Sequence, residues 1–373
     1  MPYPCHGSLS TSVAGELNAF SALLATLLSL PSIAPARAIS RRAVSAPAYA
    51  DGQASTIGRN ERQKMMGFEN AAKPNEYPQS TVRRLLIVGG AVAAVLAGAA
   101  APASAAVPGH RVVVTTSGFD ATDFKTAPDA ACPTGKRLIG TGYTTSSGLG
   151  NEIAVDEVIP VGSPDAAPTS ARVGAAESDV TADRSWNVSA SAICSDPLPG
   201  LQRVLANSAF NSNHSKSATA QCPAGKQLTG TGYSINGSAG EIVIERVQPN
   251  NGPSAAPTAV SVHATESDPV AASWSVQAFA VCANPLPGLV QVAQQSSAFD
   301  STQTKSATAK CPTGKILTGT GYLTIATSGV GGELTIDSVR PAGLGGSVEV
   351  RAVEEDPFGG NWRVDAVAIC ANQ

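Results

Sequence analysis

Three copies of one twelve-residue stretch decide the fold: CPTGKRLIGTGY at 132–143, CPAGKQLTGTGY at 222–233 and CPTGKILTGTGY at 311–322. A second stretch follows each copy, reading WNVSASAIC at 186–194, WSVQAFAVC at 274–282 and WRVDAVAIC at 362–370. The first cysteines are 90 and 89 residues apart, and the tryptophans are 88 apart both times. A fixed period of this kind indicates tandem repeats of one structural unit.

The repeats account for nearly all of the chain after residue 106. We place repeat 1 at 107–197, repeat 2 at 198–286 and repeat 3 at 287–373. The stretches DPLPGL at 196–201 and NPLPGL at 284–289 are rich in proline and predict short, stiff linkers between the repeats.

Strand patterns dominate each repeat. The second stretch alternates with period two, so that its tryptophan, valine, alanines and cysteine share one face of a strand. The Cys-Pro-x-Gly residues suit a type I turn and predict a hairpin between the strands on either side. With about six strands per repeat and no amphipathic helix, the chain is predicted to be all-β, as three tandem antiparallel β-sandwich-like repeats of about 89 residues.

Aromatic side chains recur in every repeat and are the candidates for ligand contacts. We expect the tryptophans to fill the core over a trough lined by glycines, and stacking on a ligand ring is the alternative. Strict alternation places the tyrosines on the face opposite those glycines, where they are candidates for surface contacts. The six residues are Tyr143, Tyr233, Tyr322, Trp186, Trp274 and Trp362.

Six of the seven cysteines lie in the repeats, two in each. Six cysteines allow fifteen connectivities, and the repetition favours the one in which every repeat closes on itself. Each disulfide would close a loop of about sixty residues, worth roughly 4 kcal/mol. Zinc binding is the alternative, but each repeat lacks a second pair of ligands near its Cys-Pro-x-Gly turn. The favoured pairs are Cys132–Cys194, Cys222–Cys282 and Cys311–Cys370.

Carboxylates two residues apart also recur, and we expect them to end a strand and begin a turn. They are weak candidates for a calcium site, because two or three oxygens per repeat fall short of the six to eight that calcium takes. No catalytic motif occurs in the chain, so no enzyme activity and no cofactor are predicted. The weak metal candidates are Glu177, Asp179, Glu266, Asp268, Glu354 and Asp356.

The N-terminal part carries a targeting signal. Residues 80–105 combine an arginine pair, an apolar run and an Ala-Ser-Ala site, which predicts a cleaved signal peptide. The apolar run is too short and too rich in glycine and alanine for a stable membrane span. Residues 1–79 are predicted to be a disordered extension or a stretch outside the natural product. Residues 106–373 hold sixteen basic and twenty-three acidic residues, a net charge of −7 that argues against a nucleic-acid partner.

The combined motif Cys-Pro-x-Gly-Lys-x-Leu-x-Gly-Thr-Gly-Tyr with Trp-x-Val-x-Ala-x-Ala-x-Cys resembles tandem repeats of uncharacterised secreted actinobacterial proteins. The resemblance covers about residues 110–373. It implies export from a bacterium and a β-rich fold, and it implies no activity. A fainter similarity to the vitelline membrane outer layer proteins makes a pseudo-threefold β-prism the alternative fold.

The sequence therefore predicts a secreted, extracellular, non-catalytic protein with a binding or structural role at the cell exterior. Three copies of a weak site would gain avidity on an extracellular glycan or a cell-surface polymer, which is the expected partner. A secreted hydrolase acting on such a polymer and a secreted inhibitor or toxin-like protein are the two alternatives.

Overall fold

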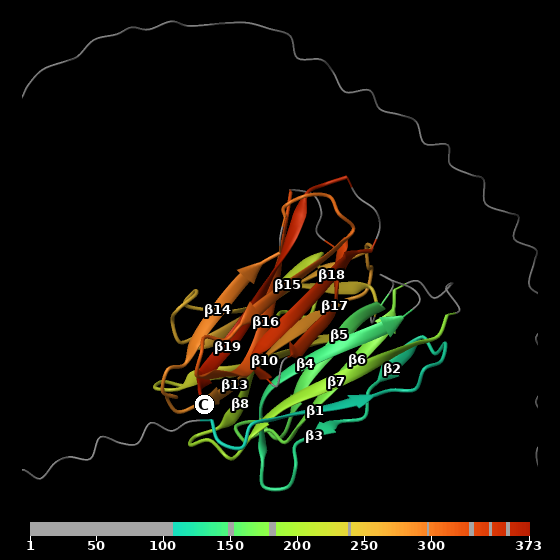
Figure 1. Cartoon of the computed structure of the whole chain (residues 1–373). Coiled ribbons are helices and arrows are strands. Elements are labelled where there is room, and N and C mark those ends of the chain that lie inside the picture. The colour runs from blue at the N-terminus through green and yellow to red at the C-terminus, as the bar shows by residue number, and fades with distance from the viewer. Residues whose placement is uncertain are drawn as a thin grey trace, which may run out of the picture. The chain divides into compact units, whose positions relative to one another are not determined.

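The computed structural model describes residues 107–147, 153–178, 184–237, 240–296, 298–327, 332–342, 345–355 and 359–373. The predicted extension (1–79), the predicted signal peptide (80–105), Asp179 and Asp356 lie outside these residues. Within them the chain forms strands and turns with no α-helix, which confirms the all-β prediction (Figure 1).

The repeats supply the same series of strands with one difference: the second strand of repeats 2 and 3 is replaced in repeat 1 by two short strands. Repeat 1 holds β1 (Arg111–Thr116), β2 (Phe124–Thr126), β3 (Ala130–Ala131), β4 (Arg137–Ser147), β5 (Ile153–Val161), β6 (Ser170–Glu177) and β7 (Trp186–Ser195). Repeat 2 holds β8 (Gln202–Asn207), β9 (Ser215–Gln221), β10 (Gln227–Asn236), β11 (Ile242–Pro249), β12 (Ala259–Glu266) and β13 (Ser275–Ala283). Repeat 3 holds β14 (Val290–Gln295), β15 (Thr304–Lys310), β16 (Lys315–Ala326), β17 (Leu334–Ala342), β18 (Ser347–Glu354) and β19 (Trp362–Asn372).

Three antiparallel sheets form, and each is shared between two repeats. Their strand orders are β1-β7-β4-β17-β18-β15, β2-β6-β5-β10-β13-β8 (with β3 also paired to β6) and β14-β19-β16-β11-β12-β9. Every repeat thus gives one half of its strands to one sheet and the other half to another. The shared strands join the three repeats around a pseudo-threefold axis, with β4, β10 and β16 close together at the centre of the unit (Figure 1).

The predicted hairpin at each Cys-Pro-x-Gly turn is wrong. In repeat 2, β9 pairs with β12 while β10 pairs with β13 and β5, so the turn crosses from one sheet to another. The turn itself begins at the proline, because Lys226 N donates to Pro223 O (3.0 Å). Gly225 stands at its third position with φ of +81°, which is the geometry of a type II turn and a conformation that favours glycine.

The three predicted disulfides are confirmed. Cys132 pairs with Cys194, Cys222 with Cys282 and Cys311 with Cys370, with Cα atoms 5.7 Å apart in every case. Each bond joins the turn after the outermost strand of one half-sheet to the central strand of the other. The disulfides therefore fasten together the two half-sheets of each repeat.

The predicted linkers pack as part of the repeats they precede. Leu198 and Leu286 are buried in the core, and the turn between the repeats accepts a hydrogen bond from the end of the last strand of the following repeat. Asn284 N donates to Pro199 O (2.9 Å), and Asn372 N donates to Pro287 O (3.1 Å). These segments are therefore packed against the repeat that follows them and do not act as spacers between repeats.

No helix among the described residues is long and apolar enough to cross a membrane.

Candidate functional site

A closed ring of hydrogen bonds ties the three central strands together at the axis. The Thr141 hydroxyl donates to Thr231 O (2.8 Å), Thr231 donates to Thr320 O (2.6 Å), and Thr320 donates to Thr141 O (2.9 Å). All three threonines are buried, so each bond satisfies groups that water cannot reach. The Gly-Thr-Gly stretch of the repeat is thus the place where the repeats meet.

The glycines beside these threonines are required by close approach of backbone to backbone. A Cβ on Gly230 would lie 2.2 Å from Ile139 O, and one on Gly319 would lie 2.3 Å from Thr229 O. A Cβ on Gly140 would lie 2.1 Å from Thr318 O, which completes the circle. The glycines therefore admit the neighbouring repeat, and the predicted trough for the tryptophan rings is wrong.

The tyrosines lie in the interior, which corrects their prediction as surface contacts. Tyr143, Tyr233 and Tyr322 are each 2% exposed and meet near the axis. A β-bulge between Leu228 and Gly230 shifts the register, so that Leu228 pairs with Cys282 and Tyr233 with Ala278, on the same face as Trp274. Simple alternation missed this reversal. Burial raises the pKa of all three phenols well above the ordinary value, so they stay protonated.

The space beside the tyrosines is too small for a ligand. The cavity lined by the three threonines and three tyrosines has a volume of about 10 Å³. A single water already needs about 10–15 Å³ on this measure. The axis is therefore a packed joint, and the candidate binding surface must lie elsewhere.

All three repeats present equivalent loops at one end of the axis. Along each of β4, β10 and β16, the threonine of the hydrogen-bonded ring comes before the tyrosine. Since the three threonines meet at the axis and the three tyrosines also meet there, the three strands run in the same direction along the axis. The end of each strand pairs at or beside the repeat's tryptophan, as in Ser147↔Trp186 and Ala326↔Trp362. We call this end of the unit the tyrosine end; the three tryptophans and the loops beside them lie there.

A buried lysine lies over each buried tryptophan at the tyrosine end. The ammonium of Lys125 is 4.9 Å from the Trp186 ring centroid, that of Lys216 is 4.3 Å from Trp274, and that of Lys305 is 5.1 Å from Trp362. The tryptophans are 0% exposed, which matches their interpretation as core residues and leaves no face for a ligand ring. A desolvated ammonium over an indole face stabilises the fold by about 2 kcal/mol.

Each lysine also closes a short loop five residues upstream. Lys125 contacts the Asp120 carboxylate, Lys305 contacts the Asp300 carboxylate, and Lys216 donates to the Asn211 side-chain oxygen at 2.6 Å. The same Asp or Asn oxygen accepts a backbone N–H two residues further on, which fixes the start of the loop.

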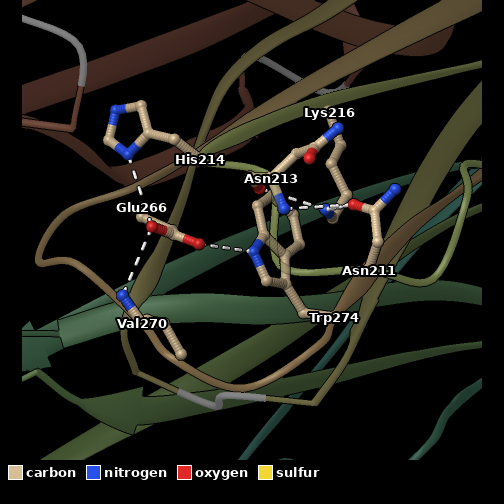
Figure 2. Close-up of polar contacts among 7 residues, drawn as sticks. All are labelled: Asn211, Asn213, His214, Lys216, Glu266, Val270 and Trp274. Carbon is tan, nitrogen blue, oxygen red and sulfur yellow. Dashed lines mark hydrogen bonds and ion pairs between the residues drawn. The ribbon is translucent and has the colours of Figure 1, made fainter.

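Buried glutamates bind the edge of the same indoles. Trp274 Nε1 donates to Glu266 (2.8 Å), and Trp362 Nε1 donates to Glu354 (2.7 Å). Glu177, Glu266 and Glu354 end β6, β12 and β18, as the sequence predicted. Figure 2 shows the arrangement in repeat 2, where the carboxylate also accepts from Val270 N (3.3 Å) and contacts His214 (3.4 Å).

Those bonds determine the chemistry of the Glu266 carboxylate. Burial opposes its ionisation, but the hydrogen bonds from Trp274, Val270 and His214 outweigh burial and lower its pKa. Asp268, two residues on, is exposed beyond the end of β12. The two carboxylates predicted as a weak calcium pair in repeat 2 thus lie in different surroundings, one buried and one exposed.

Three phenylalanines at the tyrosine end recur at one position of all three repeats, and they were not among the predicted site residues; Phe124, 48% exposed beside Lys125, occurs in repeat 1 and has no counterpart in repeats 2 and 3. Phe119, Phe210 and Phe299 each come directly before the Asp or Asn that contacts the buried lysine, and they are 63%, 65% and 44% exposed. The sequence signal was a Ser-x-Phe-Asp/Asn pattern in every repeat, outside the cysteine and tryptophan stretches.

Both sides of each phenylalanine loop are fastened to the strand that carries the tryptophan. In repeat 2, Ser208 N donates to Val276 O (2.9 Å) and Val276 N donates back to the Ser208 hydroxyl (3.0 Å). After the phenylalanine, Trp274 N donates to Asn211 O (2.8 Å). Repeat 1 has the same bonds through Ser117, and repeat 3 has them through Ser296, which lies one residue further from its phenylalanine. Each exposed phenylalanine therefore lies on a short loop whose two sides are hydrogen-bonded to a core strand.

The comparisons with known proteins add no assignment. No protein-family model matches the chain, and no curated protein matches its sequence.

Proposed function

We propose that the chain is a secreted, non-catalytic binding protein that grips a partner at the cell exterior with its three phenylalanine loops. The observation that carries this proposal is the recurrence of an exposed phenylalanine at one position of all three repeats, at one end of the unit. Single exposed apolar residues are common on proteins. A threefold set on fastened loops is the pattern expected of a multivalent contact surface.

The energetics favour a partner that meets all three loops. Burying one exposed phenylalanine contributes about 1.5–3 kcal/mol. Because the loops are already fixed in the free protein, little ordering entropy is lost on binding. Three weak contacts on one rigid body then act together on a polymer or a repetitive surface.

The three disulfides are consistent with an extracellular or otherwise oxidising environment, and they support export. An extracellular glycan or another cell-surface polymer is the proposed partner class, because such partners present repeated sites. The acidic net charge of the body, −7 over residues 106–373, disfavours a nucleic acid as the partner.

Binding of the exported protein to an array of glycans and cell-surface polymers tests the proposal. We expect the triple variant Phe119→Ala, Phe210→Ala, Phe299→Ala to lose at least about a hundredfold in affinity while its unfolding midpoint stays unchanged. Val114→Ala is the matched control, since Val114 is 57% exposed on β1 but lies outside the loops. Equal binding by the triple variant and the wild type would refute the proposal, and so would hydrolysis of the polymer by the protein.

A further inference from the structure

The lysine of repeat 2 differs from its two counterparts in its partner. Lys125 and Lys305 each face an aspartate, whereas Lys216 faces the neutral side chain of Asn211. Lys216 is 7% exposed, and among the described residues no carboxylate contacts its ammonium; Glu266 is the negative charge that acts on it without contact. Burial lowers the pKa of Lys216 and the charge of Glu266 raises it; the net lowering favours the nucleophilic free amine.

The geometry around this pair places a nucleophile against a polarised carbonyl. Lys216 Nζ lies 2.6 Å from Asn211 Oδ1 and 3.0 Å from Asn213 O (Figure 2). Asn211 Oδ1 also accepts from Asn213 N (3.1 Å), so a backbone donor separate from the lysine draws electrons from the carboxamide carbon. The Trp274 ring, 4.3 Å from Nζ, holds the lysine end in place.

We propose that Lys216 and Asn211 join in an intramolecular isopeptide bond. The Lys216 nitrogen forms a bond to Cγ of Asn211, and the bond between Cγ and Nδ2 of Asn211 breaks. Starting from the ammonium and the carboxamide, the products are one secondary amide and one ammonium ion. Charge and atoms balance without an oxidant, a metal or an added reactant. The new bond permanently closes the loop that carries Phe210.

The other two repeats provide the internal comparison. The lysine contacts, together with hydrogen bonds from Thr122 and Thr302, lower the pKa of Asp120 and of Asp300 to about 2, so both are carboxylates at neutral pH. A carboxylate resists attack by an amine because its carbon already bears the electrons of the negative charge. These two pairs stay ion pairs, and only the pair in repeat 2 is assigned the crosslink.

Intact-mass spectrometry of the purified full chain tests the assignment. With the disulfides counted, we expect a mass about 17 Da below that of the sequence, from the loss of one ammonia. Fragmentation of a protease digest should give a branched peptide in which Lys216 is joined to residue 211. A full-length mass with Lys216 open to amine labelling after denaturation would overturn the proposal. A gain of about 1 Da at Asn211 would overturn it equally, because water would then have taken the place of the lysine.

Two variants make the test specific. Asn211→Asp copies the pair of repeats 1 and 3, so it should fold normally and show no loss of ammonia. Lys216→Arg keeps the positive charge but removes the nucleophilic amine, and it should also restore the full mass. Persistence of the 17 Da deficit in Lys216→Arg would place the reaction elsewhere in the chain and overturn the proposal.

Discussion

The carboxyl group of Asp156 is the most informative site to perturb. It is 5% exposed at a β-bulge of β5, where Gly240 N donates to Oδ1 (3.2 Å) and no described residue hydrogen-bonds to Oδ2. The strand beside it carries Gly174, where the equivalent register positions of repeats 2 and 3 hold His263 and Arg351. Among the described residues, repeat 1 thus has a glycine where repeats 2 and 3 place a histidine or an arginine against the equivalent carboxylate.

The cost of ionising this group can be calculated. Burial raises the pKa of Asp156 from 3.8 to about 7, against a smaller lowering by the Gly240 N–H. The folded protein thus holds the Asp156 proton more tightly than the unfolded chain. Its stabilising effect is complete below pH 3.8 and is lost as pH rises toward 7. The difference in pKa corresponds to about 4 kcal/mol of unfolding free energy.

Asp156→Asn should remove this pH dependence. Near pH 4 we expect the variant and the wild type to be about equally stable. At pH 8 the variant should be more stable by up to about 4 kcal/mol, because it has no proton to lose. Guanidinium unfolding at several pH values, with the disulfides intact, measures both curves.

Asp165→Asn is the control, because Asp165 is exposed and its φ of 58° suits asparagine equally well. Burial also raises the pKa of Asp337 to about 6, so both proteins lose stability from this second group as pH rises. The quantity to compare is therefore the difference in unfolding free energy between wild type and Asp156→Asn at each pH. A difference that stays constant from pH 4 to pH 8 would refute the reasoning.

Three further substitutions test the joint at the axis and the disulfides. Gly230→Ala places a Cβ 2.2 Å from Ile139 O and should cost about 3 kcal/mol in denaturant unfolding; an unchanged midpoint would contradict the close approach. Thr231→Val removes one donor of the threonine ring and should cost about 1–3 kcal/mol, whereas Thr231→Ser should restore most of that stability. Cys222→Ser with Cys282→Ser should lower stability by about 4 kcal/mol, and equal stability of reduced and oxidised wild type would argue against this value.

The sequence predicted the parts of the fold that depend on repetition and alternation. Equal spacing of the cysteines favoured pairing within each repeat, and the structure has those three pairs. The tryptophan stretch alternates without interruption and forms β7, β13 and β19 with the tryptophans buried. Such local patterns survive folding because each strand has one face in the core.

The predictions that were wrong concern residues whose placement depends on contacts between repeats. One extra residue at the bulge beside Leu228 reverses the faces of the strand, and alternation cannot reveal it. The sequence of Gly230 and Thr231 gave no sign that the neighbouring repeat would lie against them. The exposed phenylalanines were within reach of sequence comparison, since aligning the repeats brings Phe119, Phe210 and Phe299 into register.

Sharing of every sheet between two repeats has a consequence for how the protein can fail. Loss of any one repeat would remove half the strands from two sheets. Each of those sheets would then have an exposed edge strand with unpaired backbone N–H and C=O groups, which can pair with another chain. The three copies should therefore melt as one, and proteolytic loss of a single copy should lead to aggregation instead of a smaller working protein.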